Sequence, residues 1–155
     1  MTVPTALQRV YPDSNVLIEG LFSPWSASRA LLILARARLF RLILSPYVEA
    51  EVERALLHRL ARDAAAGSRL IEDYALALTL LAPERTRGIT PEEFEAHRTL
   101  IRHVHDVPVL AAAIKVRPDW FVTSNTAHFT PEVAAPTGLR IVTPHEFLAQ
   151  CRLLP

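Results

Sequence analysis

The stretch DVPVLAAAIKVRPDWFVTSN, residues 106–125, decides how this chain folds. It begins with an acid in front of a run of small and apolar residues that suits a helix, with Pro108 in its first turn. After a short polar break, the apolar residues 120–122 have the pattern of a buried strand and lead into the polar residues 123–125. The stretch therefore predicts a helix and then a strand, with polar groups at the start of the helix and at the end of the strand.

The rest of the chain continues this alternation of short apolar strands and longer helices. Ser45-Pro46 and Thr90-Pro91 each place a capping hydroxyl before a proline, which is typical of a helix start. In chain order we expect a strand at 7–11, a helix at 14–21, a helix from Ser26 or Ser28 to 37, a strand at 40–44, helices at 46–60 and 68–81, a loop at 83–88, a helix from 90, a helix after 106, strands at 120–123 and 141–142, and a helix from 143 to about 152. This order indicates an α/β fold in which helices cover both faces of a parallel sheet, and ligands of such sheets gather at the carboxyl ends of the strands.

The composition is that of one folded domain, expected to span residues 1–155. Half of the residues are hydrophobic, yet no apolar run approaches the ~20 residues that a membrane-spanning helix needs. Residues 1–8 lack the charged and then apolar pattern of a secretory signal, and the lone Cys151 cannot form an internal disulfide. We therefore expect a soluble, cytoplasmic protein without a membrane partner.

The charge of the chain is nearly balanced, with 17 basic and 16 acidic residues and a net charge of +1. A nucleic-acid partner would therefore need a local basic patch rather than bulk attraction. Arg98 and Arg102 lie four residues apart on one face of a predicted helix, and Arg85 and Arg87 lie in a predicted loop. Either pair could contact phosphates, and a solvated surface is the alternative for both.

Three acids stand where they could meet at the carboxyl end of the sheet. Asp13 follows the first strand, Asp106 begins a helix, and Glu51 lies on the packed side of its helix. Each has a structural alternative, because Asp13 and Asp106 are also good helix caps, and Glu51, between Glu49 and Glu53, also fits a solvated charged face. A carboxylate beside a packed face needs a partner, and a metal ion would be one.

Other residue patterns indicate structure rather than chemistry. His103-Val104-His105-Asp106 contains a His-x-His pair, but a zinc site would need a further ligand at a defined spacing, and none follows before His128. The four glycines form no phosphate-binding loop and no Gly-x-Ser-x-Gly elbow for a serine nucleophile. We expect Phe22 and Trp25 to fill the core beneath a loop, with stacking on a base as the alternative.

Four stretches in order resemble the motifs of one protein family. They are Asp13-Ser14-Asn15-Val16-Leu17-Ile18, LSPYVEAEV at 44–52, DVPVLAAA at 106–113 and FVTSNTAHF at 121–129. Their order and spacing, over roughly residues 7–148, resemble the PIN-domain nucleases, which include the toxins of bacterial and archaeal toxin–antitoxin pairs (VapC-like proteins). The resemblance implies a three-layer α/β/α sandwich around a mainly parallel sheet of four or five strands, and a single PIN-like nuclease domain at 1–155.

The resemblance also implies a set of site residues. By position, Asp13, Glu51 and Asp106 correspond to catalytic acids that hold Mg²⁺ or Mn²⁺ for RNA cleavage. Asn125 stands where the family usually has a fourth acid, so as a metal ligand it would offer an oxygen without a charge. His128 occupies a further position that is often Asp. Hard divalent ions prefer such oxygen ligands, and a bound ion can activate water and neutralise developing charge at a phosphate.

Ser14, Asn15 and Thr123 lie beside these acids in the sequence motifs, and we expect them, with Arg98 and Arg102, to contact the substrate. The leading interpretation is a metal-dependent endoribonuclease with an RNA substrate, and the resemblance adds an antitoxin protein and a homodimer as partners to test.

Two other classes of function stay open. The first is a catalytically weak or inactive PIN-like domain that binds RNA or a protein partner, which the missing fourth acid favours. The second is a phosphate-accepting regulatory domain, which would need a second acid beside Asp13 and a lysine at a late strand end. Lys115 instead lies within the helix that follows Asp106.

Overall fold

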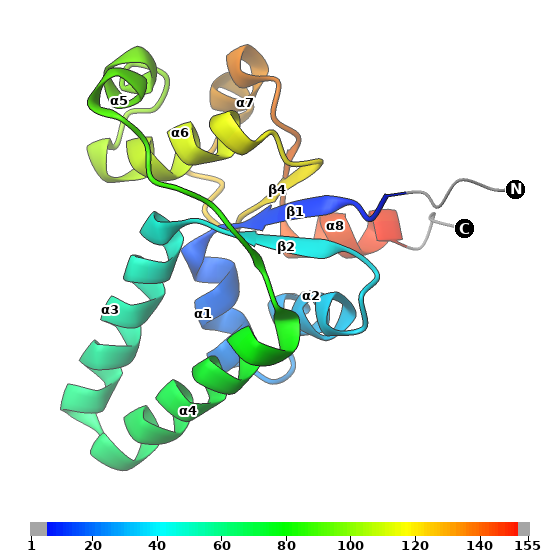
Figure 1. Cartoon of the computed structure of the whole chain (residues 1–155), viewed down its shortest axis with the longest axis vertical. Coiled ribbons are helices and arrows are strands. Elements are labelled where there is room, and N and C mark those ends of the chain that lie inside the picture. Colours follow the sequence, from blue (N-terminus) through cyan, green and yellow to red (C-terminus); the bar gives the residue numbers. More distant parts are fainter. Residues whose placement is uncertain (1–5, 152–155) are drawn as a thin grey trace, which may run out of the picture.

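The computed structural model describes residues 6–151, and a sheet of five parallel strands forms its centre (Figure 1). The strands are β1 (Arg9–Pro12), β2 (Arg41–Leu44), β3 (Glu84–Arg85), β4 (Trp120–Val122) and β5 (Ile141–Val142), in the spatial order β3-β2-β1-β4-β5. The register aligns Val10 with Leu42 on one side and with Trp120 on the other. The predicted α/β class, with a parallel sheet at its centre, is confirmed.

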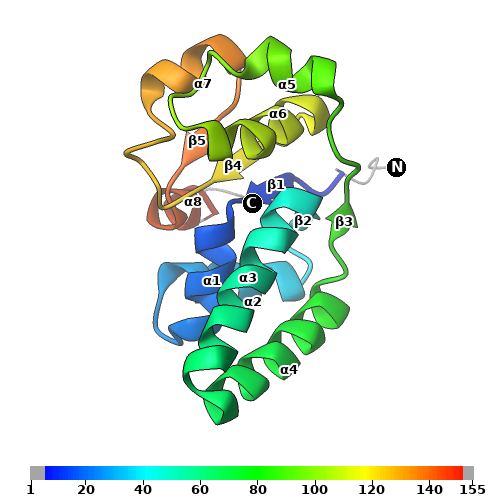
Figure 2. The ribbon, with the colours of Figure 1, turned by 90° about the vertical axis from the view of Figure 1, so that its left-hand side faces the viewer.

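Within residues 6–151, eight α-helices and one short 3₁₀ helix connect the strands or follow the last of them. They are α1 (Ser14–Phe22), α2 (Ala27–Arg36), α3 (Pro46–Arg62), α4 (Ala64–Leu81), α5 (Pro91–His97), η1 (Val104–Asp106), α6 (Val107–Val116), α7 (Pro131–Thr137) and α8 (Pro144–Cys151). Helices α5, α6 and α7 lie on one side of the sheet and α1 to α4 with α8 on the other, as Figures 1 and 2 show. The predicted three-layer sandwich is therefore confirmed. No helix within residues 6–151 is long and apolar enough to cross a membrane.

The core lies between the central strands and the helices on both faces. Tyr11 on β1 and Phe121 on β4 are fully buried, and their rings stack with centroids 5.3 Å apart. The Tyr11 hydroxyl reaches Ser45 Oγ at 2.8 Å and the carbonyl oxygen of Val109 at 3.0 Å, so its polar end is satisfied inside the core. These contacts connect β1 to the start of α3, which carries Glu51, and to α6, which directly follows Asp106.

Helices α3 and α4 form a hairpin that extends away from the sheet (Figure 2). Gly67 makes this close pairing possible, since a Cβ atom at that position would lie 2.3 Å from Cα of Leu60. The sequence pattern predicts that the second helix of this pair starts at residue 68, after the glycine. That boundary is wrong, because α4 begins at Ala64, with Asp63 accepting a hydrogen bond from the Ala66 N–H.

Three further predictions differ from the structure. Residues 84–85 of the predicted loop pair with β2 as the edge strand β3, a pairing too short to leave a pattern in the sequence. No element is predicted at residues 131–137, where the structure has α7 with Pro136 inside it. Phe22 and Trp25 are 39% and 98% exposed, so the expectation that they fill the core is wrong. The predicted end of the last helix at Arg152 lies outside the described residues.

A polar residue follows every strand directly: Asp13, Ser45, Thr86, Thr123 and Thr143. In a parallel sheet all of these positions lie at the same edge, so the carboxyl edge is where the topology concentrates polar chemistry.

Candidate active site

Asp13 is the one charged residue that is buried within residues 6–151, with 4% of its surface exposed. It directly follows β1, and its backbone N–H continues the strand pairing by donating to the Val122 carbonyl at 2.8 Å. Its carboxylate accepts hydrogen bonds from the Ser14 N–H (2.8 Å), the Thr123 hydroxyl (2.8 Å) and the Asn15 side-chain amide (3.0 Å). Asp13 therefore does cap α1, as the structural alternative holds, but it is also the enclosed centre of a polar cluster.

The environment of Asp13 disfavours its negative charge. The pKa of Asp13 is raised from 3.8 to about 6, mainly by burial and to a smaller extent by the negative charges of Glu51 and Asp106, while the hydrogen bonds from Thr123 and Ser14 act in the opposite direction. Glu51 and Asp106 are therefore close enough to Asp13 to disfavour its charge. Within residues 6–151, Asp13 forms no ion pair that would offset this effect.

Glu51 lies on α3 beside the buried residues Val48 and Val52, and it is itself half-buried. Its carboxylate accepts a hydrogen bond from the Ser14 hydroxyl, so it points toward the start of α1. Glu49, one of its acidic neighbours on α3, instead pairs with Arg85 at 2.7 Å. The prediction that Glu51 lies on the packed side of its helix is confirmed, and Ser14 is placed between two acids rather than toward open solvent.

Asp106 is the last residue of η1 and immediately precedes α6. Its side chain makes no capping hydrogen bond to that helix, so the alternative that it serves as a helix cap is wrong. Its Oδ2 atom lies 2.7 Å from Nδ1 of His128, and the two side chains are 17% and 33% exposed, respectively. A carboxylate can only accept here, so Nδ1 of His128 carries the hydrogen and donates it.

The loop after β4 is held to the loop after β1 by several hydrogen bonds. The Thr123 hydroxyl, which donates to Asp13, accepts from the Asn125 N–H at 3.0 Å, and the Ser124 N–H donates to Asn15 Oδ1 at 3.0 Å. The Asn125 carbonyl accepts from the Phe129 N–H at 3.0 Å. Its side chain is half-buried and makes no hydrogen bond among the described residues. Asn125 thus holds the turn through its backbone hydrogen bonds, and its side-chain amide has no hydrogen-bond partner among the described residues.

The acids do not form a ready-made metal cluster. Within residues 6–151, no group of three or more His, Cys, Asp or Glu side chains is arranged so as to hold one ion. Glu51 is engaged by Ser14 and Asp106 by His128, so a shared ion would require these side chains to turn. The donor set itself fits a hard divalent cation, because it consists of carboxylate, hydroxyl and amide oxygens around one disfavoured negative charge.

Arg98 and Arg102 do not share a helix face, so that part of the prediction is wrong. Helix α5 ends at His97, and Ile101, four residues further on, lies in the core with 4% of its surface exposed. Arg98 forms an exposed ion pair with Glu95 at 3.5 Å, and Arg102 lies exposed in the segment before η1.

Two contacts of the site were not predicted from the sequence. They are the hydrogen bond from Ser14 to Glu51 and the bond between His128 and Asp106. The second had one signal, because His128 stands at a motif position that is often acidic in the family that the sequence resembles.

Comparisons with known proteins agree with this architecture. A family model described as a PIN domain matches residues 9–127. Curated protein sequences gave no match. The fold is similar to that of VapBC2 from Rickettsia felis, crystallised with a DNA fragment from its promoter, at a TM-score of 0.63 and 14% identity, covering 88% of this chain and 98% of that one.

The fold is also similar to that of PAE2754 from Pyrobaculum aerophilum. The TM-score is 0.57 at 14% identity, and the match covers 97% of this chain and 100% of that one. At such low identity both likenesses concern the fold alone.

Proposed function

The chain belongs to the PIN-domain family, a family of nucleases, and from this premise we propose that it is a metal-dependent endoribonuclease that hydrolyses RNA phosphodiester bonds. The observation that carries the proposal is the buried carboxylate of Asp13 at the carboxyl edge, whose pKa is raised by burial and by two further acids, Glu51 and Asp106. Such a cluster is electrostatically unfavourable by itself, and a divalent cation would relieve it.

The ion that suits this donor set is Mg²⁺ or Mn²⁺. Asp13, Glu51 and Asp106 would supply carboxylate oxygens, and Asn125 would add a neutral oxygen. When bound, the ion would supply an activated water and neutralise charge that develops on the phosphate.

The neighbouring residues would hold these acids in place and contact the RNA. Thr123 and Asn15 fix the Asp13 carboxylate, and Ser14 fixes Glu51, so these three residues also line the place where a phosphate would approach. Arg98 and Arg102 remain candidates for contact with phosphates further along the strand, each acting by itself.

The decisive experiment measures cleavage of single-stranded RNA with Mg²⁺ or Mn²⁺ and with EDTA. We expect cleavage only with metal, and a loss of about 10²–10³-fold in Asp106→Asn, since one charge at the reacting phosphate is removed. Asp73→Asn, an exposed acid on α4, is the matched control and should keep full activity. Chelator-resistant cleavage, or equal rates for Asp106→Asn and Asp73→Asn, would contradict the proposal.

A second candidate is a PIN-like domain that binds RNA or a protein with little or no turnover. Two observations favour it: the amide of Asn125 in place of a usual acid, and the engagement of Glu51 and Asp106 by other side chains. In that case the protein would bind RNA without cleaving it at saturating Mn²⁺.

A toxin role is the finer form of the nuclease proposal. It implies an antitoxin partner, and the similar VapBC2 structure includes promoter DNA. We therefore expect a small DNA-binding protein to be encoded beside this chain, and its co-expression to relieve growth arrest caused by this chain. A homodimer is part of the same proposal and is tested by the mass of the purified protein in solution.

A further inference from the structure

Two histidines form a stacked pair directly beside Asp106. The rings of His103 and His128 have centroids 3.6 Å apart and planes inclined by 16°. His103 comes from the segment before η1, and His128 from the loop after β4. The pair therefore joins two segments that each border the carboxyl edge, and neither the metal proposal nor the core requires it.

The two rings are held very differently. His128 is fixed from the side, because its Nδ1 donates to Asp106 Oδ2 at 2.7 Å. The other carboxylate oxygen of Asp106 has no hydrogen-bond partner among the described residues. His103 is an exposed residue whose side chain makes no capping bond to η1, and it rests one face against His128. Because His103 is exposed although one face of its ring is covered by His128, we assign its exposed surface to the opposite face of the ring; the next residue, Val104, is 59% exposed.

On the basis of the proposed function, we infer that the open face of His103 is a stacking platform for an unpaired nucleobase next to the scissile phosphate. Unpaired bases of RNA stack on flat side chains, including histidine, whatever their sequence. A platform works best when its ring cannot rotate, and the anchored His128 ring limits the rotation of His103. Because His103 stacks on His128, and His128 is hydrogen-bonded to Asp106, a base on His103 would lie within reach of the acids that would act on its phosphate.

The geometry favours a base over the other ligands that histidines serve. A metal site is not formed, since His103, His128 and Asp106 are not arranged to hold one ion. A phosphate would need a donor fork or several N–H groups, whereas the open surface here is a flat ring with an exposed valine beside it. Stacking of a nucleobase needs only such a flat ring.

The test measures binding of a short single-stranded RNA that carries one 2-aminopurine at successive positions. All proteins also carry Asp13→Asn, so that the RNA stays intact. We expect one position at which binding quenches the fluorophore, and His103→Ala should remove that quenching and weaken binding about tenfold. His103→Phe keeps a flat ring without ring nitrogens and should restore both. His58→Ala, an exposed histidine on α3, is the matched control and should change neither.

An abasic nucleotide at the quenched position provides the second arm. It should weaken binding to the protein with His103 and leave binding to His103→Ala unchanged. Equal affinity and quenching with and without the His103 ring, or a His103→Phe variant as weak as His103→Ala, would overturn the inference, and so would a failure to bind RNA.

Cleavage is scored separately, with the natural Asp13 and Mn²⁺. If RNA is cleaved but the His103 variants bind normally, only the platform is wrong. If the platform binds RNA as expected but no cleavage occurs, the nuclease proposal fails, the placement beside a scissile phosphate fails with it, and His103 stands only as a base-stacking site.

Discussion

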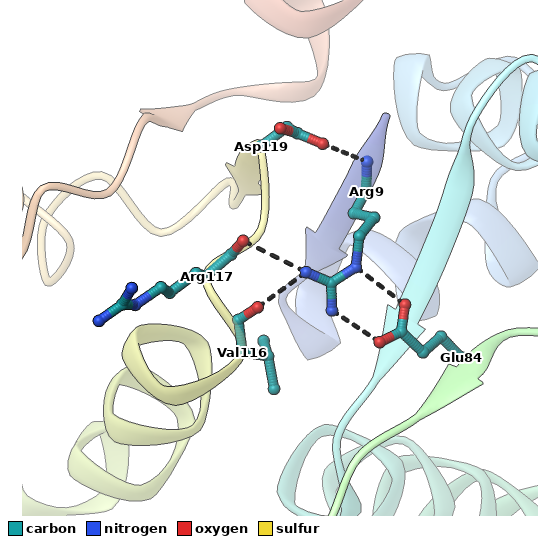
Figure 3. A network of polar contacts seen from close by, with 5 residues as sticks. All are labelled: Arg9, Glu84, Val116, Arg117 and Asp119. Carbon is teal, nitrogen blue, oxygen red and sulfur yellow. Dashed lines mark hydrogen bonds and ion pairs between the residues drawn. The ribbon is translucent and has the colours of Figure 1, made fainter. Parts of the chain in front are cut away.

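The two ends of the sheet differ in whether their charged side chains have partners of opposite charge. At the amino end, Arg9 on β1 reaches across β2 to Glu84 on β3, with Nη2 to Oε1 at 2.6 Å and Nε to Oε2 at 2.9 Å (Figure 3). Its Nη1 also donates to the Val116 carbonyl at the end of α6 at 2.8 Å, and its backbone N–H donates to Asp119 at 2.6 Å. The hydrogen bond from Arg9 lowers the pKa of Glu84 below its usual value.

At the carboxyl end, Asp13 instead lies near two other acids, Glu51 and Asp106. Burial and the nearby carboxylates raise the pKa of Asp13, the reverse of the effect on Glu84. The same parallel topology produces both ends, and the side chains placed at each end determine whether its charges are paired. Paired charges at the amino end stabilise the fold, whereas like charges at the carboxyl end cost stability and are useful only if something positive binds there.

The largest expected effect comes from removing the charge of Asp13. Its pKa is higher in the folded state, so the stability that it contributes is fully present below about pH 3.8 and is lost as pH rises through about 6. The loss is on the order of 3 kcal/mol for this buried group. Without metal, Asp13→Asn should therefore gain stability over the natural protein as pH rises from 4 to 7. Urea unfolding in EDTA across this range measures the difference.

Added Mn²⁺ provides the control for this prediction. It should stabilise the natural protein at neutral pH and leave Asp13→Asn nearly unchanged, because binding to the folded state alone shifts unfolding. A difference in stability between the two proteins that is constant with pH would show that the Asp13 charge is not disfavoured.

A smaller effect of the opposite sign is expected at the amino end. Glu84→Gln should lower the free energy of unfolding at neutral pH by about 1 kcal/mol, a value reduced because both partners are one-third exposed. The folded pKa of Glu84 is lowered, so its contribution is present at neutral pH and disappears as pH falls through that value. Glu95→Gln, from the more exposed pair with Arg98, is the control and should cost less. RNA cleavage by Glu84→Gln should be unchanged, and reduced cleavage would mean that the two ends are coupled.

The sequence predicts the carboxyl end better than the amino end, for a physical reason. Asp13 and Asp106 are placed by local patterns, a strand end and a helix start, which can be recognised within a few residues. The pairing of Arg9 with Glu84 joins residues 75 positions apart, across a strand, and has no local pattern. The same holds for His128 and Asp106, and for the two-residue strand β3. The error at Arg98 and Arg102 arose because α5 ends at His97, earlier than its helical pattern suggests.

The smallest expected effect tests how much charge the carboxyl end can still accept. Asn125→Asp adds one negative charge at a half-buried position whose backbone, and not its side chain, holds the turn to Phe129. The fold should tolerate the change, and Mn²⁺ affinity measured by calorimetry should rise roughly fivefold, the part of the Coulomb gain that is left after solvent screening. Asn125→Ala removes the amide oxygen without adding charge and should not tighten binding. Gln8→Glu adds the same charge at the amino end, where Gln8 accepts from the Trp120 indole at 2.9 Å, and should leave Mn²⁺ affinity unchanged. If Gln8→Glu and Asn125→Asp tighten Mn²⁺ equally, the ion responds to net charge and the two ends of the sheet are not distinct in the way proposed.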